Sequence, residues 1–103
     1  MNTKVTLRGE SFWYTVTDFD CEDFDDTNIG EEVDVLHVYF KDGFKVHLFA
    51  ELTDLQDGVP ELSYPTFTTH PNNVRISDNK RSVVLDLLKK HSLSYLILEF
   101  LFL

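Results

Sequence analysis

The sequence VDVLHVYFKDGFKVHLFA, residues 33–50, decides the fold. Two segments rich in β-branched and aromatic residues flank an Asp-Gly pair, a combination that is typical of a β-hairpin. A two-residue loop at Asp42-Gly43 would place polar and apolar side chains together on both faces. A three-residue loop from Lys41 to Gly43 separates them, and the burial of one apolar face sets the register of a hairpin. We therefore predict the three-residue loop, with Gly43 at positive φ.

This register sorts the hairpin into an apolar face and a mixed face. It pairs Phe40 with Phe44 and places His37 opposite His47. The apolar face contains Leu36, Val38, Phe40, Phe44, Val46, Leu48 and Ala50. The mixed face contains Val35, His37, Tyr39, Lys45, His47, Phe49 and Glu51. The sorting predicts a sheet with one buried and one solvated face.

A second hairpin is predicted near the N-terminus, from Lys4 to Thr17. Gly9 suits the first position of a two-residue type II′ turn, Gly9-Glu10, which would pair Leu7 with Phe12. The alternation places five apolar residues on one face: Val5, Leu7, Phe12, Tyr14 and Val16. Trp13 falls on the solvated face, where a tryptophan is either covered by a loop or available to bind a partner.

Residues 53–73 read as irregular, because three prolines and the pairs Asp57-Gly58 and Asn72-Asn73 interrupt them. An edge strand within Leu62–Thr69 is compatible with Pro65, which has no N–H to donate in a central strand. Residues 72–77 suggest one more short extended segment.

A helix is predicted from about Lys80 to His91, with Ser77 or Asp78 as its N-cap. Four residues recur at helical spacing on one face: Val84, Leu87, Leu88 and His91. Residues 95–103 are apolar except for Glu99, which favours a strand central in the sheet, with a continued helix as the alternative. Together these elements predict an α+β fold. It is a mostly antiparallel sheet of two or more hairpins, with one helix on its apolar face and a C-terminal strand.

The composition is that of a small, acidic, globular chain. Its 103 residues suit a single domain, residues 1–103, and 43% of them are hydrophobic. The formal net charge of −9 opposes binding to nucleic acid or anionic membranes and favours a basic protein partner. With Cys21 as the one cysteine, no intrachain disulfide can form. No signal peptide or membrane span is recognisable, so we expect a cytoplasmic protein.

Residues 18–32 are unusually acidic and form the first candidate site. We expect a surface loop, with a helical turn as an option, which Phe19, Phe24 and Ile29 would pin to the domain. Spacing excludes an EF-hand calcium loop, because a loop that begins at Asp18 has Ile29 where a glutamate is needed. The loop is either merely solvated or a contact surface for a basic protein. The candidate residues are Asp18, Asp20, Glu22, Asp23, Asp25, Asp26, Glu31 and Glu32.

The mixed sheet face is the second candidate site, with Trp13, Tyr39, His37 and His47 as partner contacts. Directly opposed residues of a hairpin have Cβ atoms about 5 Å apart, so the two histidines can share a metal ion. Zinc, however, needs three or four ligands. A third ligand, such as Cys21 or an aspartate of the acidic loop, is unmarked in the sequence. We therefore predict neither a metal site nor a cofactor.

The chain contains no recognisable catalytic motif. Cys21 has no activating residues around it, and no phosphate-binding loop or nucleophile elbow is present. We therefore predict a non-enzymatic binding protein that inhibits a basic, nucleic-acid-acting protein by occlusion. Immunity proteins against nuclease toxins and viral inhibitors of host defence nucleases have this general character, an analogy that rests on no shared motif. The alternatives are a module that forms homodimers through its aromatic sheet face and a metal-dependent enzyme.

Overall fold

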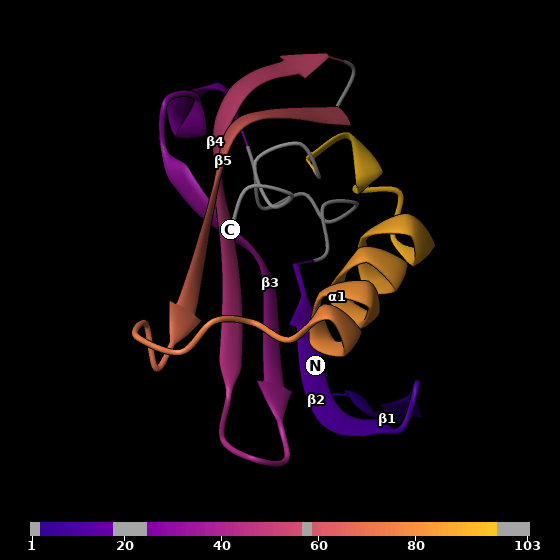
Figure 1. Ribbon diagram of the computed structural model, residues 1–103. Coiled ribbons are helices and arrows are strands. Elements are labelled where there is room, and N and C mark those ends of the chain that lie inside the picture. Colours follow the sequence, from indigo (N-terminus) through magenta and orange to yellow (C-terminus); the bar gives the residue numbers. More distant parts are fainter. Residues whose placement is uncertain (1–2, 18–24, 57–58, 97–103) are drawn as a thin grey trace.

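The computed structural model describes residues 3–17, 25–56 and 59–96. They form a five-stranded antiparallel sheet in which each strand pairs with the next along the chain, and one α-helix, which packs beside the sheet near β2 (Figure 1). The predicted α+β class is confirmed. The elements are β1 Thr3–Leu7, β2 Glu10–Val16, η1 Asp26–Asn28, β3 Glu32–Phe40, β4 Lys45–Gln56, β5 Val59–His70, α1 Asp78–Lys90 and η2 Ser94–Leu96.

A continuous apolar core joins the sheet to α1. From α1 it contains Val83, Val84, Leu87 and Leu88, all of them buried. From the central hairpin it contains all seven residues of the predicted apolar face, namely Leu36, Val38, Phe40, Phe44, Val46, Leu48 and Ala50. Burial of this face leaves the opposite side of the sheet as the surface for polar and aromatic side chains.

The hairpin between β3 and β4 has the predicted three-residue loop. The Phe40 N–H donates to the Phe44 carbonyl at 2.8 Å, and the Gly43 N–H donates to the Phe40 carbonyl at 2.9 Å. Gly43 has φ +95°, and His37 lies directly opposite His47. The predicted loop, glycine conformation and histidine pairing are confirmed.

A β-bulge at Val35 interrupts the alternation of β3. Asp34 pairs with Phe49 but Leu36 pairs with Leu48, so Val35 is an extra residue in its strand. Val35 is fully buried in the core, and the prediction that placed it on the mixed face was wrong. A bulge turns two successive side chains to the same side, and here Val35 joins Leu36 in the core. Asp34 is thereby placed on the solvated face with His37.

The N-terminal hairpin turns one residue earlier than predicted, at Arg8-Gly9. Leu7 pairs with Glu10 and Val5 with Phe12, so the predicted pairing of Leu7 with Phe12 was wrong. The register differs by two residues, which is one full period of a strand, so the predicted buried face still stands.

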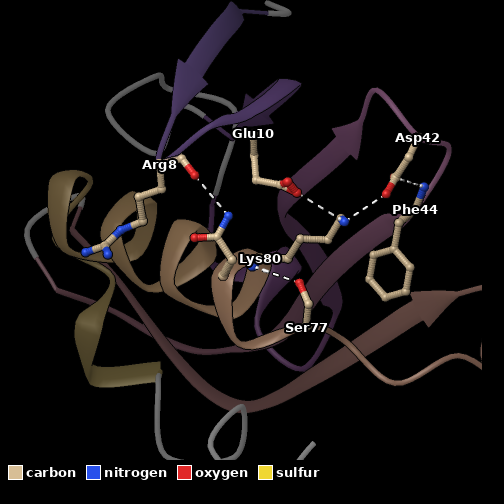
Figure 2. Close-up of polar contacts among 7 residues, drawn as sticks. Arg8, Glu10, Asp42, Phe44, Ser77 and Lys80 are labelled. Carbon is tan, nitrogen blue, oxygen red and sulfur yellow. Dashed lines mark hydrogen bonds and ion pairs between the residues drawn. The ribbon is translucent and has the colours of Figure 1, made fainter.

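Contacts with α1 fix this turn. Arg8 and Gly9 have φ +53° and +78°, as a type I′ turn requires, and a non-glycine residue at positive φ is strained. The Arg8 carbonyl accepts a hydrogen bond from Asn79 Nδ2 at 2.9 Å, and the guanidinium donates to Asp86 at 2.7 Å. Figure 2 draws the contact of the Arg8 carbonyl. Both contacts join residues far apart in the sequence, so the residues of the turn alone could not predict them.

Residues 53–56 and 59–70, predicted to be largely irregular, instead belong to the long antiparallel strands β4 and β5. Pro65 lies in the edge strand, as predicted, at a bulge where the register shifts between Phe49 and Glu51. Tyr64, the residue before it, has φ +55°. Prolines are compatible with an edge strand that bulges, and for that reason they did not end it here. Of the short segment predicted to be extended, residues 72–74 form a turn and a bend, and residues 75–77 belong to no strand, although Ser77 has an extended backbone.

The helix α1 begins after the predicted N-cap. The Ser77 hydroxyl accepts a hydrogen bond from the Lys80 N–H, and His91 is the C-cap. Inside the first turn, the Lys80 ammonium contacts Glu10 at 3.1 Å and Asp42 at 2.8 Å (Figure 2). These ion pairs hold the start of α1 against β2 and against the β3–β4 loop.

The described residues at the start of the predicted C-terminal strand form a 3₁₀ helix instead. Tyr95 and Leu96 belong to the 3₁₀ helix η2, and Leu96 is buried in the core. The remaining residues of that prediction, 97–103, lie outside the described part of the chain. Adjacent strands of the described sheet are already hydrogen-bonded to each other, so none of its central positions is open to a further strand.

Candidate functional site

The face of the sheet opposite α1, here called the outer face, brings together four of the predicted site residues. Trp13 lies opposite Tyr39, and His37 lies opposite His47. The cross-strand pairs extend these contacts into two rows that cross the sheet. The aromatic row is Lys4, Trp13, Tyr39, Lys45 and His70, and the histidine row is Thr15, His37, His47 and Thr68.

The aromatic row exposes two large rings to solvent. Trp13 is 41% exposed and Tyr39 is 37% exposed. The Lys4 ammonium lies 5.4 Å from the Trp13 ring centroid, and Lys45 lies 5.9 Å from that of Tyr39, within cation–π range. An exposed aromatic pair bordered by cations is the kind of surface that supplies anchor residues in protein interfaces.

The histidine row is tightly packed and is tied to the aromatic row. The ring centroids of His37 and His47 are 3.4 Å apart, and that of Phe49 is 3.7 Å from that of His47. His37 Nδ1 lies 3.1 Å from the Tyr39 hydroxyl, which holds this nitrogen and turns Nε2 the other way. A shallow hollow of about 340 Å³ borders both histidines and is also lined by Tyr39 and Lys45.

Asp34 completes a cluster with the two histidines. Its Oδ1 lies 3.4 Å from His47 Nε2, and its Oδ2 lies 3.7 Å from His37 Nε2. The three ligand atoms all lie within 4.8 Å of one another, so among residues 3–17, 25–56 and 59–96 this group is the one that could hold a metal ion. Regular alternation puts Asp34 on the buried face, so the sequence alone did not indicate it as a neighbour of the two histidines.

His47 and His37 are about equally exposed, with 27% and 25% of their side-chain surface accessible, and the pKa of His47 is shifted. Burial lowers the pKa of its imidazole, and the neighbouring His37 lowers that pKa further, while Asp34 raises it. The neutral form is therefore favoured at neutral pH. Its Nε2 is buried and forms no hydrogen bond of good geometry, the nearest acceptor being the Asp34 carboxylate.

A second group of charged side chains, here called the acidic end, lies where η1 meets the β4–β5 hairpin (Figure 1). Two of its acid pairs are direct cross-strand partners, Glu32 with Glu51 and Asp54 with Glu61. Like charges directly opposite each other destabilise a sheet. Residues 25–40 and 46–74 contain no lysine or arginine. The described members of the acidic end are Asp25, Asp26, Glu31, Glu32, Glu51, Asp54 and Glu61.

The acidic end includes four of the eight acids predicted as a binding loop. Asp25, Asp26, Glu31 and Glu32 are exposed, whereas Asp18, Asp20, Glu22 and Asp23 lie outside the described residues. The helical turn expected as an option is present as η1. Glu51 was expected on the mixed face but not as a site residue, and Asp54 and Glu61 were missed because residues 53–73 were expected to be largely irregular.

Backbone hydrogen bonds attach the described part of the loop to the sheet. Of the three apolar residues expected to pin the loop, Ile29 is 41% exposed, and Phe19 and Phe24 lie outside the described residues. The Gly30 N–H donates to the Leu52 carbonyl at 2.8 Å, and the Leu52 N–H donates to the Glu31 carbonyl at 2.9 Å. The pKa of Asp25 is lowered by hydrogen bonds from Thr27, first from its hydroxyl and then from its N–H, so this carboxylate also caps η1.

Comparisons with protein-family models, curated proteins and solved structures found no significant match. Within the part of the chain that the structure describes, no helix is long and apolar enough to cross a membrane.

Proposed function

We propose that this protein is a non-enzymatic binding protein that docks on a basic, nucleic-acid-acting protein and inhibits it by occlusion. The opposed acid pairs Glu32–Glu51 and Asp54–Glu61 are the observation that carries the proposal. Their repulsion works against the fold, and a cationic partner that neutralises them would relieve it. We further propose that this binding takes place in the cytoplasm.

The outer face offers such a partner both charge and anchors. From Glu32 to Tyr39 is seven residues along β3, or about 23 Å at the rise of an extended strand. An interface of ordinary size, about 800 Å² on each partner, can cover both the acidic end and the aromatic row. The acids would attract the partner's lysines and arginines, and Trp13 with Tyr39 would supply buried contact.

Charge also gives the docking a direction. Carboxylates dominate the acidic end, whereas Lys4 and Lys45 flank the rings of the aromatic row. A basic patch on the partner would be attracted to the first and repelled from the second. Carboxylates that pair with the partner's phosphate-binding lysines and arginines would block access of nucleic acid to them. This is inhibition by occlusion.

The test compares partner capture with fold stability in the same variants. A variant with Glu32→Gln, Glu51→Gln, Asp54→Asn and Glu61→Gln should capture less of a basic cellular protein, identified by mass spectrometry, while its melting temperature stays equal or rises. Asp78→Asn, at the start of α1, is the control and should capture normally. Capture by the fourfold variant at the wild-type level, in low salt, would reject the acidic end as the docking surface.

Self-association is the second candidate function, because Trp13 and Tyr39 form an exposed pair. A dimer through the aromatic row would bury both rings, and Trp13→Ala would make it dissociate. Light scattering over a range of protein concentrations measures this. A monomer at all concentrations would reject self-association, and the aromatic row would then remain as a contact surface for the basic partner.

A further inference from the structure

We propose that Asp34, His37 and His47 form a binding site for a divalent transition-metal ion of the Zn²⁺ class. This inference is independent of the proposed docking on a basic protein, since it rests on the geometry of three side chains. Two imidazoles and one carboxylate are a ligand set that proteins use for zinc.

The backbone assembles these three residues by a specific irregularity. Asp34 and His37 are three positions apart, and in a regular strand residues three apart lie on opposite faces. The bulge at Val35 adds the residue that brings both to the outer face. Thr17 anchors the bulge, since its N–H donates to the Val35 carbonyl at 3.1 Å and its hydroxyl donates to the Asp34 carbonyl. Bulges are frequent beside functional sites because they redirect a side chain in this way.

The distances between the ligand atoms fit a shared ion. Zinc bonds of about 2.0–2.2 Å in a tetrahedron place neighbouring ligand atoms about 3.3–3.5 Å apart. Asp34 Oδ1 lies 3.4 Å from His47 Nε2, and Asp34 Oδ2 lies 3.7 Å from His37 Nε2. One ligand atom from each of the three residues lies within 4.8 Å of the other two. Small side-chain rotations would therefore be enough to close the site around an ion.

The surroundings of both imidazoles suit metal binding. With Nε2 on the metal, His37 would donate its Nδ1 proton to the Tyr39 hydroxyl, the kind of supporting contact that orients a metal-bound histidine. His47 Nε2 is buried without a hydrogen bond of good geometry, and coordination would satisfy it. Three protein ligands leave a fourth position for water or for a donor atom from a bound partner.

Zinc binding can be measured directly by calorimetry with Zn²⁺ as the only ligand, in a buffer that does not chelate. Every protein carries Cys21→Ser, so that its thiol does not contribute. We expect one Zn²⁺ per chain. Asp34→Asn, His37→Gln and His47→Gln should each weaken binding at least about tenfold, since even a lost supporting contact costs that much.

Two matched controls separate this site from general charge effects. His70→Gln removes another histidine of the outer face, and Glu61→Gln removes a carboxylate of β5, so both should bind Zn²⁺ as the parent does. Asp34 is mostly exposed, so Asp34→Asn should fold normally, and circular dichroism checks this. Absorption of bound Co²⁺ gives a second measurement, with intense visible bands expected for tetrahedral nitrogen and oxygen ligands.

Two results would overturn the proposal. One is the absence of saturable one-to-one binding in the Cys21→Ser parent. The other is wild-type affinity in a folded Asp34→Asn variant, which would show that the histidines act without the carboxylate.

Discussion

Charged side chains are paired differently at the two ends of the sheet: opposite charges are in contact at one end, and like charges face each other at the other. Near the β3–β4 loop, carboxylates meet cations: Glu10 and Asp42 contact Lys80, and Asp86 contacts Arg8. At the acidic end, carboxylates meet carboxylates across the strands. The first arrangement fastens α1 to the sheet, whereas the second places like charges opposite each other, which costs the sheet energy. Groups that cost the fold energy without packing in return are the ones to examine for binding.

The largest expected difference between the two regions is in packing. Leu87→Ala, on the buried face of α1, should destabilise the protein by roughly 2–5 kcal/mol. Ile29→Ala, at the exposed acidic end, should change the free energy of unfolding by less than about 0.5 kcal/mol. Urea denaturation of both variants gives the comparison. Similar losses in the two would mean that the acidic end is part of the core after all.

The loop at the ion-paired end should be sensitive to its backbone conformation. Gly43→Val should cost about 1–3 kcal/mol, because a β-branched residue at positive φ is strained. A Cβ at this position would meet no atom within 4 Å, so a steric clash would not explain the loss. Gly43→Asn is the control and should cost less, since asparagine tolerates positive φ. Equal losses would point to a cause other than φ.

Lys80 tests whether the ion pairs stabilise the fold. Lys80→Met keeps most of the aliphatic contact but leaves Glu10 and Asp42 without their cation, and should cost about 1 kcal/mol. Thermal melting at low and high salt measures the effect. A variant as stable as the wild type would show that α1 is held by its apolar face alone.

Removal of a charge at the acidic end should have the opposite sign. Glu51→Gln relieves its repulsion with Glu32 and should stabilise the protein by a few tenths of a kcal/mol. Salt should bring the wild type closer to the variant, because it screens exposed charges. A destabilised Glu51→Gln variant would contradict the view that this pair opposes folding.

The smallest effect concerns acid pH at the ion-paired end. Hydrogen bonds, first from Lys80 and then from the Phe44 N–H, lower the pKa of Asp42, and a hydrogen bond from Arg8 lowers that of Asp86. Their stabilising contribution is therefore present above the unfolded pKa of about 4 and is lost as pH falls further. Melting curves from pH 6 to pH 2.5 should fall less steeply in an Asp42→Asn, Asp86→Asn variant. Parallel curves would remove these pairs as a cause of acid sensitivity.

Where alternation and a glycine turn agreed, the sequence was enough to predict the structure. The β3–β4 hairpin followed from one apolar face and Gly43, and the histidine pair of the candidate site came with it. The first hairpin shows the limit of this reasoning. A shift of two residues leaves both faces unchanged, so alternation cannot distinguish Arg8-Gly9 from Gly9-Glu10 as the turn. Contacts of Arg8 with α1 decide between them.

The site residues that the sequence did not indicate lie where the regular alternation of a strand is interrupted. Val35 is apolar, so nothing in the sequence marks it as the extra residue of a bulge, and Asp34 could not be placed beside the histidines. Pro60 and Pro65 suggested an irregular segment, although a bulged edge strand accommodates both. The acid pair Glu32–Glu51 depends on the register shift at the Val35 bulge, and the pair Asp54–Glu61 became apparent only with the β4–β5 register.

The prolines of β5 also hinder the addition of a further strand at the β5 edge of the sheet. A strand from another molecule would need a row of backbone donors along the β5 edge, but Pro60 and Pro65 have none to give. The bulge at Pro65, with Tyr64 at φ +55°, also breaks the regular spacing that such pairing requires. This edge therefore resists the strand-by-strand stacking that leads to fibres, even in a sheet so rich in β-forming residues. A protein that binds through β5's side of the sheet must approach it from the face.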